Sequence, residues 1–257
     1  MTQLNSLQIS NWDGIVMGGG VGISVFSPFR IATENTLFAM PETKIGFFTD
    51  VCGGYFLSRL RNNIGYYLGL TGMRLKGEEV YKAGIANYFI PRERLPQVYS
   101  DLKRELAHSR EPKETIDEIL LRYNQPPVNR VIEHEDDIRY IFNSQSVEEI
   151  FEKLKQNKTP FYAKIREAIE GQCPLSVHVT FRSIEESKRK TAKDCFITDY
   201  SISQHFMAGK DFFEGVRCTL VDKGSKPTWS HPNILAVRPE EVDKYFEPLT
   251  SEKLLRL

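Results

Sequence analysis

The stretch FRIATENTLFAMP, Phe29 to Pro41, places two short apolar runs on either side of a polar turn. The runs Phe29–Thr33 and Leu37–Met40 predict two strands, and the residues Glu34-Asn35-Thr36 predict the turn between them. Pro41 ends the second strand, because its nitrogen carries no hydrogen to donate to a neighbouring strand. Short strands of this kind, followed by helical patterns, are typical of an α/β fold.

Downstream of Pro41, helical and extended patterns alternate up to about residue 92. The spacing of apolar residues predicts a helix over residues 53–70 that is interrupted at Asn62-Asn63. A short helix capped at Gly84 follows, and then a buried strand over residues 85–90. This alternation assigns the first 92 residues to an α/β region.

The remaining residues, 93–257, are predicted to be mainly helical. Ser146 and Glu149 have the spacing of a capping box, which opens a helix that runs through Leu154. The proline-containing segment 124–137 is predicted to be an exposed loop. Further helices are predicted over residues 95–107, 160–171, 175–188, 190–208 and 239–249.

The composition excludes several classes of function. Lys and Arg number 34, as do Asp and Glu, so neither a direct nucleic-acid partner nor a membrane-surface partner is expected. No apolar run reaches the about 18 residues of a membrane span. The four cysteines are irregularly spaced, which predicts no zinc site and no disulfide framework and favours a reducing compartment. The first ten residues lack the basic and apolar regions of a targeting peptide.

A glycine run precedes the two strands, with four glycines in the five positions 18–22. The run lacks the Lys and Ser/Thr of a phosphate loop, and Ile23 stands where a dinucleotide-binding fingerprint needs its third glycine. Two uses remain open. The glycines permit tight helix packing, or they form a strand-to-helix turn whose amides face an anion or a polarised carbonyl.

Two carboxylates follow the glycine run. Glu42 comes directly after Pro41, and Asp50 lies between apolar residues just before a Gly-Gly turn. Taken alone, Glu42 reads as a solvated surface residue and Asp50 as the N-cap of the next helix. Taken together they form a candidate acid–base pair, because apolar neighbours raise the pKa of a carboxyl toward the range of proton transfer. The sequence has no serine-nucleophile motif, and its five histidines have no partner pattern.

The chain from about Trp12 onward resembles the crotonase (enoyl-CoA hydratase/isomerase) superfamily. The stretches that carry the resemblance are DGIVMGGGVGISV, FRIATENTLFAMPETKIGFFTDVCGGYFLSRL, LGLTGMRLKG, VYKAGIANYFI and DFFEGVRCTLVDKGSKPTW. It implies a partial crotonase-like spiral of ββα repeats. Residues 1–92 would form the second half of its α/β core, and residues 93–257 the helical C-terminal region of the same domain.

Within the superfamily the resemblance is to thioester hydrolases. It implies conversion of 3-hydroxyisobutyryl-CoA to 3-hydroxyisobutyrate and coenzyme A in valine breakdown, in the mitochondrial matrix. Gly22 stands where the hydratases carry a catalytic glutamate, so water addition to an enoyl-CoA is disfavoured. No metal and no separate cofactor are implied, since coenzyme A is part of the acyl-CoA substrate.

The resemblance also implies roles for individual residues. The amide of Gly19, flanked by Gly18 and Gly20, would donate a hydrogen bond to the thioester oxygen. Glu42 would act on the thioester, either as nucleophile or as the base for water. Asp50 would hold the 3-hydroxyl of the substrate.

The sequence departs from the family pattern in three ways. In the motif F-P-D-V-G-G-G around Asp50, Thr49 replaces the proline and Cys52 replaces the first glycine. About eleven residues precede the match, where the family carries a long segment with the first strands and a second oxyanion donor. A completing polypeptide is therefore expected to supply that part, and a homo-oligomer is the other expected partner. The alternative function is a non-catalytic structural subunit of a larger assembly, such as a mitochondrial ribosome.

Overall fold

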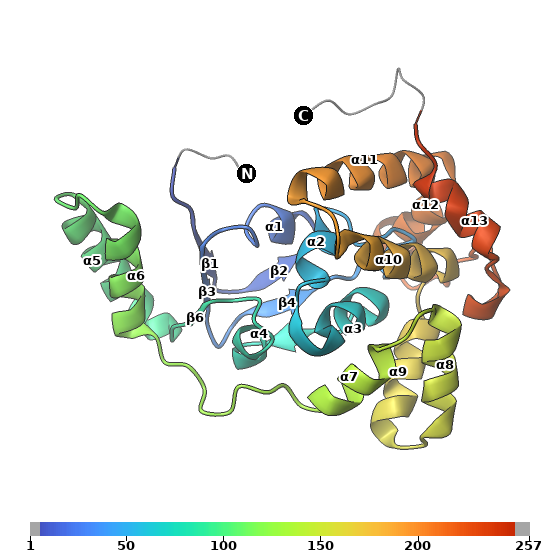
Figure 1. Ribbon diagram of the computed structural model, residues 1–257, viewed down its shortest axis with the longest axis horizontal. Coiled ribbons are helices and arrows are strands. Elements are labelled where there is room, and N and C mark those ends of the chain that lie inside the picture. The colour runs from blue at the N-terminus through green and yellow to red at the C-terminus, as the bar shows by residue number, and fades with distance from the viewer. Residues whose placement is uncertain (1–5, 250–257) are drawn as a thin grey trace. The chain divides into compact units, whose positions relative to one another are not determined.

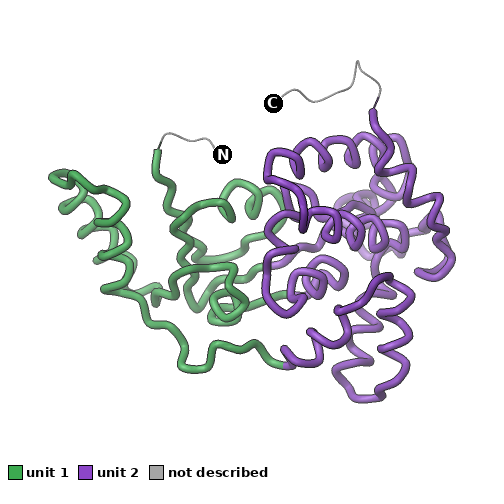
Figure 2. Tube along the Cα trace, viewed as in Figure 1, with its two compact units in different colours: residues 1–38, 74–133 green, residues 39–73, 134–257 purple. Residues whose placement is uncertain are grey.

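The computed structural model describes residues 6–249. These residues divide into two compact units, shown in different colours in Figure 2. Unit 1 takes the described residues up to Phe38 together with residues 74–133, and unit 2 takes residues 39–73 together with the described residues from His134 onward. Each unit is therefore built from two separate stretches of chain, and residue 92, where the sequence changes character, lies inside unit 1. Between residues 6 and 249, no helix combines the length and apolar character needed to cross a bilayer.

Within residues 6–249, six short strands form two sheets. One sheet has the order β1-β3-β6, from β1 (Ile9–Trp12), β3 (Phe29–Ala32) and β6 (Tyr88–Phe89), and its pairings are parallel. The other has the order β2-β4-β5, from β2 (Ile15–Met17), β4 (Leu37–Ala39) and β5 (Leu75–Lys76). The strands predicted on either side of the polar turn are confirmed as β3 and β4. The strand predicted over 85–90 is shorter, because the amides of Ile85 and Ala86 bond to the carbonyl of Val80 instead of a strand.

The described α-helices of unit 1 are α1 (Gly19–Gly22), α4 (Glu78–Lys82), α5 (Leu95–Leu106) and α6 (Pro112–Tyr123). Apolar residues of α5 and α6, among them Val98 and Ile119, pack against Phe29 and Ile31 of β3. Helix α6 is not among the predicted helices, although Pro112 occupies its first turn, where proline is favoured.

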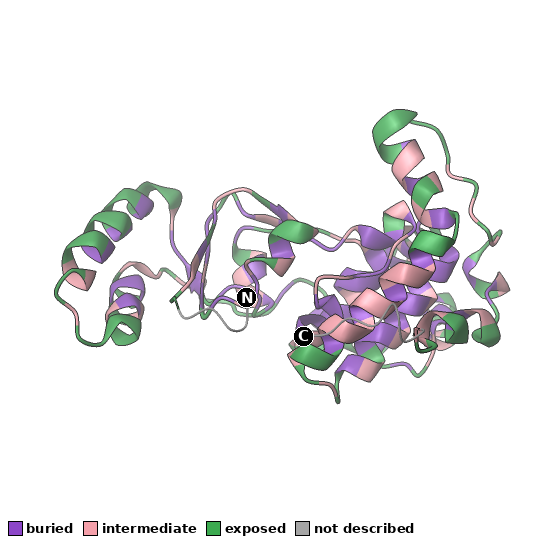
Figure 3. Cartoon of the chain, turned by 90° about the horizontal axis from the view of Figure 1, so that it is seen from above, coloured by how far each residue is buried: buried purple, intermediate pink, exposed green. Residues whose placement is uncertain are grey.

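Unit 2 is helical. Its α-helices are α2 (Gly53–Leu57), α3 (Ile64–Thr71), α7 (Glu135–Phe142), α8 (Val147–Gln156), α9 (Pro160–Glu170), α10 (Pro174–Ser187), α11 (Ala192–Ala208), α12 (Asp211–Val216) and α13 (Pro239–Asp243). Helix α10 lies among the others (Figure 1) and contacts α2, α3, α8 and α13. The helices of this unit turn their buried residues toward one another (Figure 3), so the core of unit 2 surrounds α10.

Two local predictions in unit 2 are confirmed and one is corrected. The helical pattern of residues 53–70 breaks between α2 and α3, where Asn62 and Asn63 adopt left-handed conformations. Ser146 caps α8 by accepting the amide of Glu149, whereas the carboxylate of Glu149 accepts the amide of Gln145 instead of that of Ser146, so the predicted helix start is confirmed and the capping box is only half formed. The segment 124–137 is not a loop throughout, because its last residues already form the first turn of α7. The apolar residues that follow in α7 are buried, and their packing favours a helix that begins before them.

Candidate active site

Glu42 opens a single 3-10 turn, η1 (Glu42–Ile45), directly after Pro41. Two glycines allow other backbone segments to approach this turn closely. A Cβ atom on Gly46 would lie 2.3 Å from the carbonyl oxygen of Asp211, and one on Gly215 would lie 2.3 Å from the carbonyl of Ile45. Gly46 also has a φ of +70°, a conformation that favours glycine. The position of η1 is therefore fixed by backbone contacts with α12.

The side chain of Glu42 is buried, with 5% of its surface exposed. The expectation of a solvated surface glutamate is therefore wrong. Among the described residues, neither Oε1 nor Oε2 of Glu42 has a hydrogen-bond partner. Burial raises the pKa of Glu42 from 4.5 to about 8, and the nearby charge of Asp50 adds to this rise. Since buried polar atoms are normally paired, this orphaned carboxyl marks a candidate site for a water molecule or a ligand.

Asp50 lies in the turn that precedes α2. Its amide donates to the carbonyl of Phe48 at 2.8 Å, and its own carbonyl accepts the amide of Gly53 at 2.8 Å. The N-cap residue of α2 is Cys52, not Asp50, so the N-cap role expected for Asp50 is wrong. The carboxyl is instead half-buried, and this burial raises its pKa from 3.8 to about 6. The structure thus brings Glu42 and Asp50 close enough for their charges to interact.

The turn from Asp50 to α2 has an unusual backbone. Val51 and Cys52 both adopt left-handed conformations, with φ angles of 53° and 62°. For a β-branched residue such as valine this conformation is an outlier. The amide of Cys52 donates to Oδ2 of Asp199 on α11 at 2.7 Å. Asp199 is 6% exposed and was missed in the sequence, where it lies in an ordinary helical pattern without a local signal.

The two departures from the family motif make specific contacts. The amide of Thr49 donates to Oγ1 of Thr180 at 3.4 Å, a bond that proline cannot form. The fully buried thiol of Cys52 donates to the carbonyl of Ala192 at 3.4 Å. The neighbouring thiol of Cys195 raises the pKa of Cys52, and the thiol of Cys52 in turn lowers the pKa of Cys195. Both replacements therefore tie the Asp50 turn to α10 and α11.

The glycine run belongs to unit 1, whereas Glu42 and Asp50 belong to unit 2. Gly18 has a φ of 53° and precedes α1, whose first residues are Gly19 and Gly20. A Cβ atom at Gly19 or Gly20 would meet no heavy atom of the described residues within 4 Å, so tight packing does not explain these glycines. Amides in the first turn of a helix have no acceptor within the helix. A role of the Gly19 amide toward a thioester oxygen stays a prediction.

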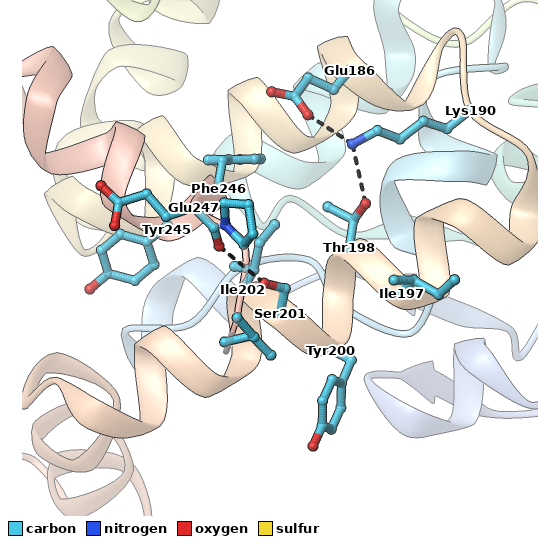
Figure 4. Close-up of a pocket in the computed structure, with 12 residues that line it drawn as sticks. Glu186, Lys190, Ile197, Thr198, Tyr200, Ser201, Ile202, Tyr245, Phe246 and Glu247 are labelled. Atoms are coloured by element: carbon cyan, nitrogen blue, oxygen red, sulfur yellow. Dashed lines mark hydrogen bonds and ion pairs between the residues drawn. The ribbon is translucent and has the colours of Figure 1, made fainter. Parts of the chain in front are cut away.

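A separate hollow of about 240 Å³ lies in unit 2 between α11 and the 3-10 turn η6 (Lys244–Phe246) (Figure 4). Neither Glu42 nor Asp50 lines it. At its edge Nζ of Lys190 bonds to Oε2 of Glu186 at 2.8 Å and to Oγ1 of Thr198 at 3.2 Å. Between residues 6 and 249, no group of three or more His, Cys, Asp or Glu side chains is arranged to hold a metal ion.

Two curated proteins resemble most of the chain. The protein named 3-hydroxyisobutyryl-CoA hydrolase, mitochondrial, from Gallus gallus is 46% identical over 248 residues, which cover 94% of this chain and 64% of that protein. The protein of the same name from Dictyostelium discoideum is 43% identical over 255 residues, covering 97% of this chain and 66% of that protein. The chain therefore spans just under two thirds of the length of these relatives.

The fold is also that of a solved structure. An enoyl-CoA hydratase from Rhodobacter sphaeroides 2.4.1 superposes with a TM-score of 0.87 at 28% identity, covering 100% of this chain and 72% of that one. This likeness confirms the predicted crotonase-like α/β fold with its large helical part. The family described as Enoyl-CoA hydratase/isomerase matches residues 1–246. The chain belongs to the enoyl-CoA hydratase/isomerase family.

Proposed function

We propose that this protein hydrolyses the thioester of 3-hydroxyisobutyryl-CoA, releasing 3-hydroxyisobutyrate and coenzyme A in valine breakdown. The observation that carries the proposal is the carboxyl of Glu42, which is buried, has no hydrogen-bond partner among the described residues and has a pKa of about 8. A carboxyl with these properties suits proton transfer near neutral pH. The names of the two curated relatives support the choice of substrate and a mitochondrial location.

Glu42 can act by either of two routes. As a base, it takes a proton from water while the water oxygen bonds to the thioester carbon. The tetrahedral oxyanion then collapses, the C–S bond breaks, and the proton passes to the sulfur of coenzyme A. As a nucleophile, an oxygen of Glu42 displaces the thiolate to form an anhydride, which water then hydrolyses. Both routes need ionised Glu42, and for both we propose that the amide of Gly19 stabilises the oxyanion.

Asp50 is proposed to select the acyl group. With a pKa of about 6, its carboxyl is largely ionised at neutral pH. An ionised carboxylate only accepts hydrogen bonds, so it pairs with the 3-hydroxyl of the substrate. A thioester without this hydroxyl leaves the half-buried carboxylate unpaired, which disfavours its binding. No cofactor beyond the coenzyme A of the substrate is proposed, and a second copy or a completing polypeptide remains the proposed partner.

The proposal is tested by measuring thiol release from 3-hydroxyisobutyryl-CoA. We expect Glu42→Gln to lower kcat by about 10³-fold or more, since the amide neither takes a proton nor attacks the thioester. The matched control is Glu167→Gln, which removes an exposed carboxylate on α9 and leaves kcat unchanged. The wild-type kcat is expected to rise with pH and level off above about 8, as Glu42 ionises.

Equal rates for the wild type and Glu42→Gln would refute the assigned role of Glu42. Absence of thiol release by the wild type, together with its co-purification in a large assembly, would favour a structural subunit instead.

A further inference from the structure

We propose that Asp199 is a positioning residue for Asp50: it fixes the turn that carries the Asp50 carboxylate and so sets the discrimination between thioesters with and without a 3-hydroxyl. This inference rests on the proposed function and deepens it at the same site. Asp199 does not touch the substrate in this scheme. It acts on the backbone two residues after Asp50.

The turn that Asp199 holds does not keep its shape through local preference. Val51 and Cys52 are consecutive left-handed residues, and neither is a glycine or an asparagine. Such conformations persist only where the surrounding structure imposes them. The bond of 2.7 Å from the Cys52 amide to Oδ2 of Asp199 joins this turn to another element of unit 2. It therefore supplies a constraint that the turn itself lacks.

Asp199 is presented by a rigid helix. Helix α11 begins with a capping box, in which Oγ1 of Thr191 accepts the amide of Asp194 at 3.2 Å and Oδ2 of Asp194 accepts the amide of Thr191 at 3.2 Å. Asp199 follows on this helix, and Oγ of Ser203 donates to its carbonyl at 2.7 Å. A side chain on a well-capped helix is a firmer anchor than one on a loop.

The surroundings of Asp199 favour its neutral form. Burial raises the pKa of Asp199 well above its usual value; the hydrogen bond from the Cys52 amide opposes this rise, and the charges of Asp50 and Cys195 add to it. Lys190 lowers the pKa, but its ammonium group is held by hydrogen bonds to Glu186 and Thr198 (Figure 4). A neutral carboxyl still accepts the Cys52 amide and adds no second negative charge beside Asp50. Asparagine can therefore take the place of Asp199 in this role.

The proposal is tested by comparing kcat and KM for 3-hydroxyisobutyryl-CoA and isobutyryl-CoA. We expect Asp199→Ala to lower kcat/KM for the hydroxylated thioester by about 10- to 100-fold, mainly through KM, because the Asp50 carboxylate is no longer held in place. The value for isobutyryl-CoA should stay within about twofold, since this thioester makes no bond to Asp50. Asp199→Asn should retain the wild-type ratio, since its amide oxygen accepts the same backbone amide.

The matched control is Met207→Ala, which changes a 48% exposed side chain on the same helix without removing its cap or the acceptor at position 199. It should leave both the melting temperature and the ratio of the two thioesters unchanged. A parallel loss with both thioesters in Asp199→Ala would overturn the proposal. So would a loss of discrimination in Asp199→Asn as large as in Asp199→Ala. If Asp199→Ala does not fold, Asp199→Ser takes its place, because serine is too short to reach the Cys52 amide.

A second measurement needs no substrate and so separates this inference from the proposed function. The protection of the Cys52 amide against hydrogen exchange is followed by NMR in the wild type, Asp199→Asn and Asp199→Ala. We expect protection to fall by about tenfold or more in Asp199→Ala and to persist in Asp199→Asn. Unchanged protection in Asp199→Ala would overturn the role of Asp199, even if the wild type hydrolyses the thioester. If the Cys52 amide loses protection in Asp199→Ala but the wild type releases no thiol, the proposed function is refuted and the role of Asp199 in holding the turn stands.

Discussion

The carboxylates of α5 in unit 1 and those near η1 in unit 2 differ in what surrounds them. Asp101 on α5 accepts hydrogen bonds from Arg122 at 3.0 Å and from the hydroxyl of Tyr123 at 2.7 Å. The Tyr123 bond, joined by contacts with arginines, holds the pKa of Asp101 below its usual value. Glu42 in unit 2 has no such partner among the described residues, and burial raises its pKa to about 8.

The contrast separates a structural use of acids from a chemical one. The hydrogen bonds of Asp101 join α5 to α6. Because these bonds satisfy the carboxylate in the folded state, they contribute to the stability of unit 1. The buried carboxyl of Glu42 has no hydrogen bonds of this kind to offset the free energy of removing it from water, so its burial lowers the stability of the fold. A cost of this kind is typical of functional sites, where a perturbed pKa is retained for its chemistry.

The largest expected effect is a pH dependence of stability that resides in Glu42. Its folded pKa, about 8, lies above the ordinary 4.5, so its contribution to stability is fully present below about pH 4.5 and is lost as the pH rises through 8. We expect the wild type to lose roughly 4 kcal/mol of unfolding free energy between pH 5 and pH 9 through this group. Glu42→Gln should lose this component.

Urea unfolding of both proteins at the two pH values measures the difference. Parallel losses in the wild type and in Glu42→Gln would place the pH dependence elsewhere and weaken the contrast between the two regions.

The second prediction has the opposite sign and concerns Asp101. Its pKa is lowered in the folded state, so its contribution is present at neutral pH and is lost as the pH falls through the folded value. We expect Asp101→Asn to lower the melting temperature at pH 7 by about 2–4 °C and to flatten the loss of stability in acid. Thiol release should not change. Calorimetry between pH 3 and pH 7 checks this, with Glu118→Gln, an exposed position on α6, as control.

Identical melting profiles for the wild type and Asp101→Asn would show that the arginine-bound carboxylates contribute no stability. The contrast between the hydrogen-bonded Asp101 of unit 1 and the unpaired Glu42 of unit 2 would then not reflect a difference in stability.

The sequence predicts those turns whose residues favour the observed backbone. The break at Asn62-Asn63 is recognisable because asparagine adopts left-handed conformations readily, and both residues do so here. The same conformation at Val51 and Cys52 is imposed from outside, by contacts with α11 that lie 147 residues away in the chain. Local propensity therefore favoured an ordinary N-cap at Asp50, and the actual turn was not predictable.

The same division holds for the candidate site. Glu42 and Asp50 were identified from their spacing and from the family resemblance, because both lie in one continuous motif. The burial of Glu42 was not predictable from its turn, since η1 packs against α10 and α12, which lie far from it in the chain. Asp199 lies in the middle of a helix, where an aspartate is normally solvated, and its burial and its contact with Cys52 become visible only in the structure.

The smallest expected effect concerns Cys52, where the family motif carries glycine. Cys52→Gly removes a left-handed non-glycine residue, which favours folding by about 1 kcal/mol, and it removes a fully buried thiol, which disfavours folding by a similar amount. We expect the unfolding free energy to stay within about 1 kcal/mol of the wild type.

Discrimination between the two thioesters should also persist in Cys52→Gly, because the backbone amide still donates to Asp199. Denaturant unfolding and the two-substrate assay check both expectations on one variant. If discrimination falls as far as in Asp199→Ala, then the Cys52 thiol, through its contacts with Cys195 and the start of α11, holds the Asp50 turn, and the amide bond is secondary. If discrimination persists, the Asp50 turn depends on the acceptor that Asp199 provides. In that case the site around the buried Glu42 uses a second buried acid, Asp199, to position Asp50.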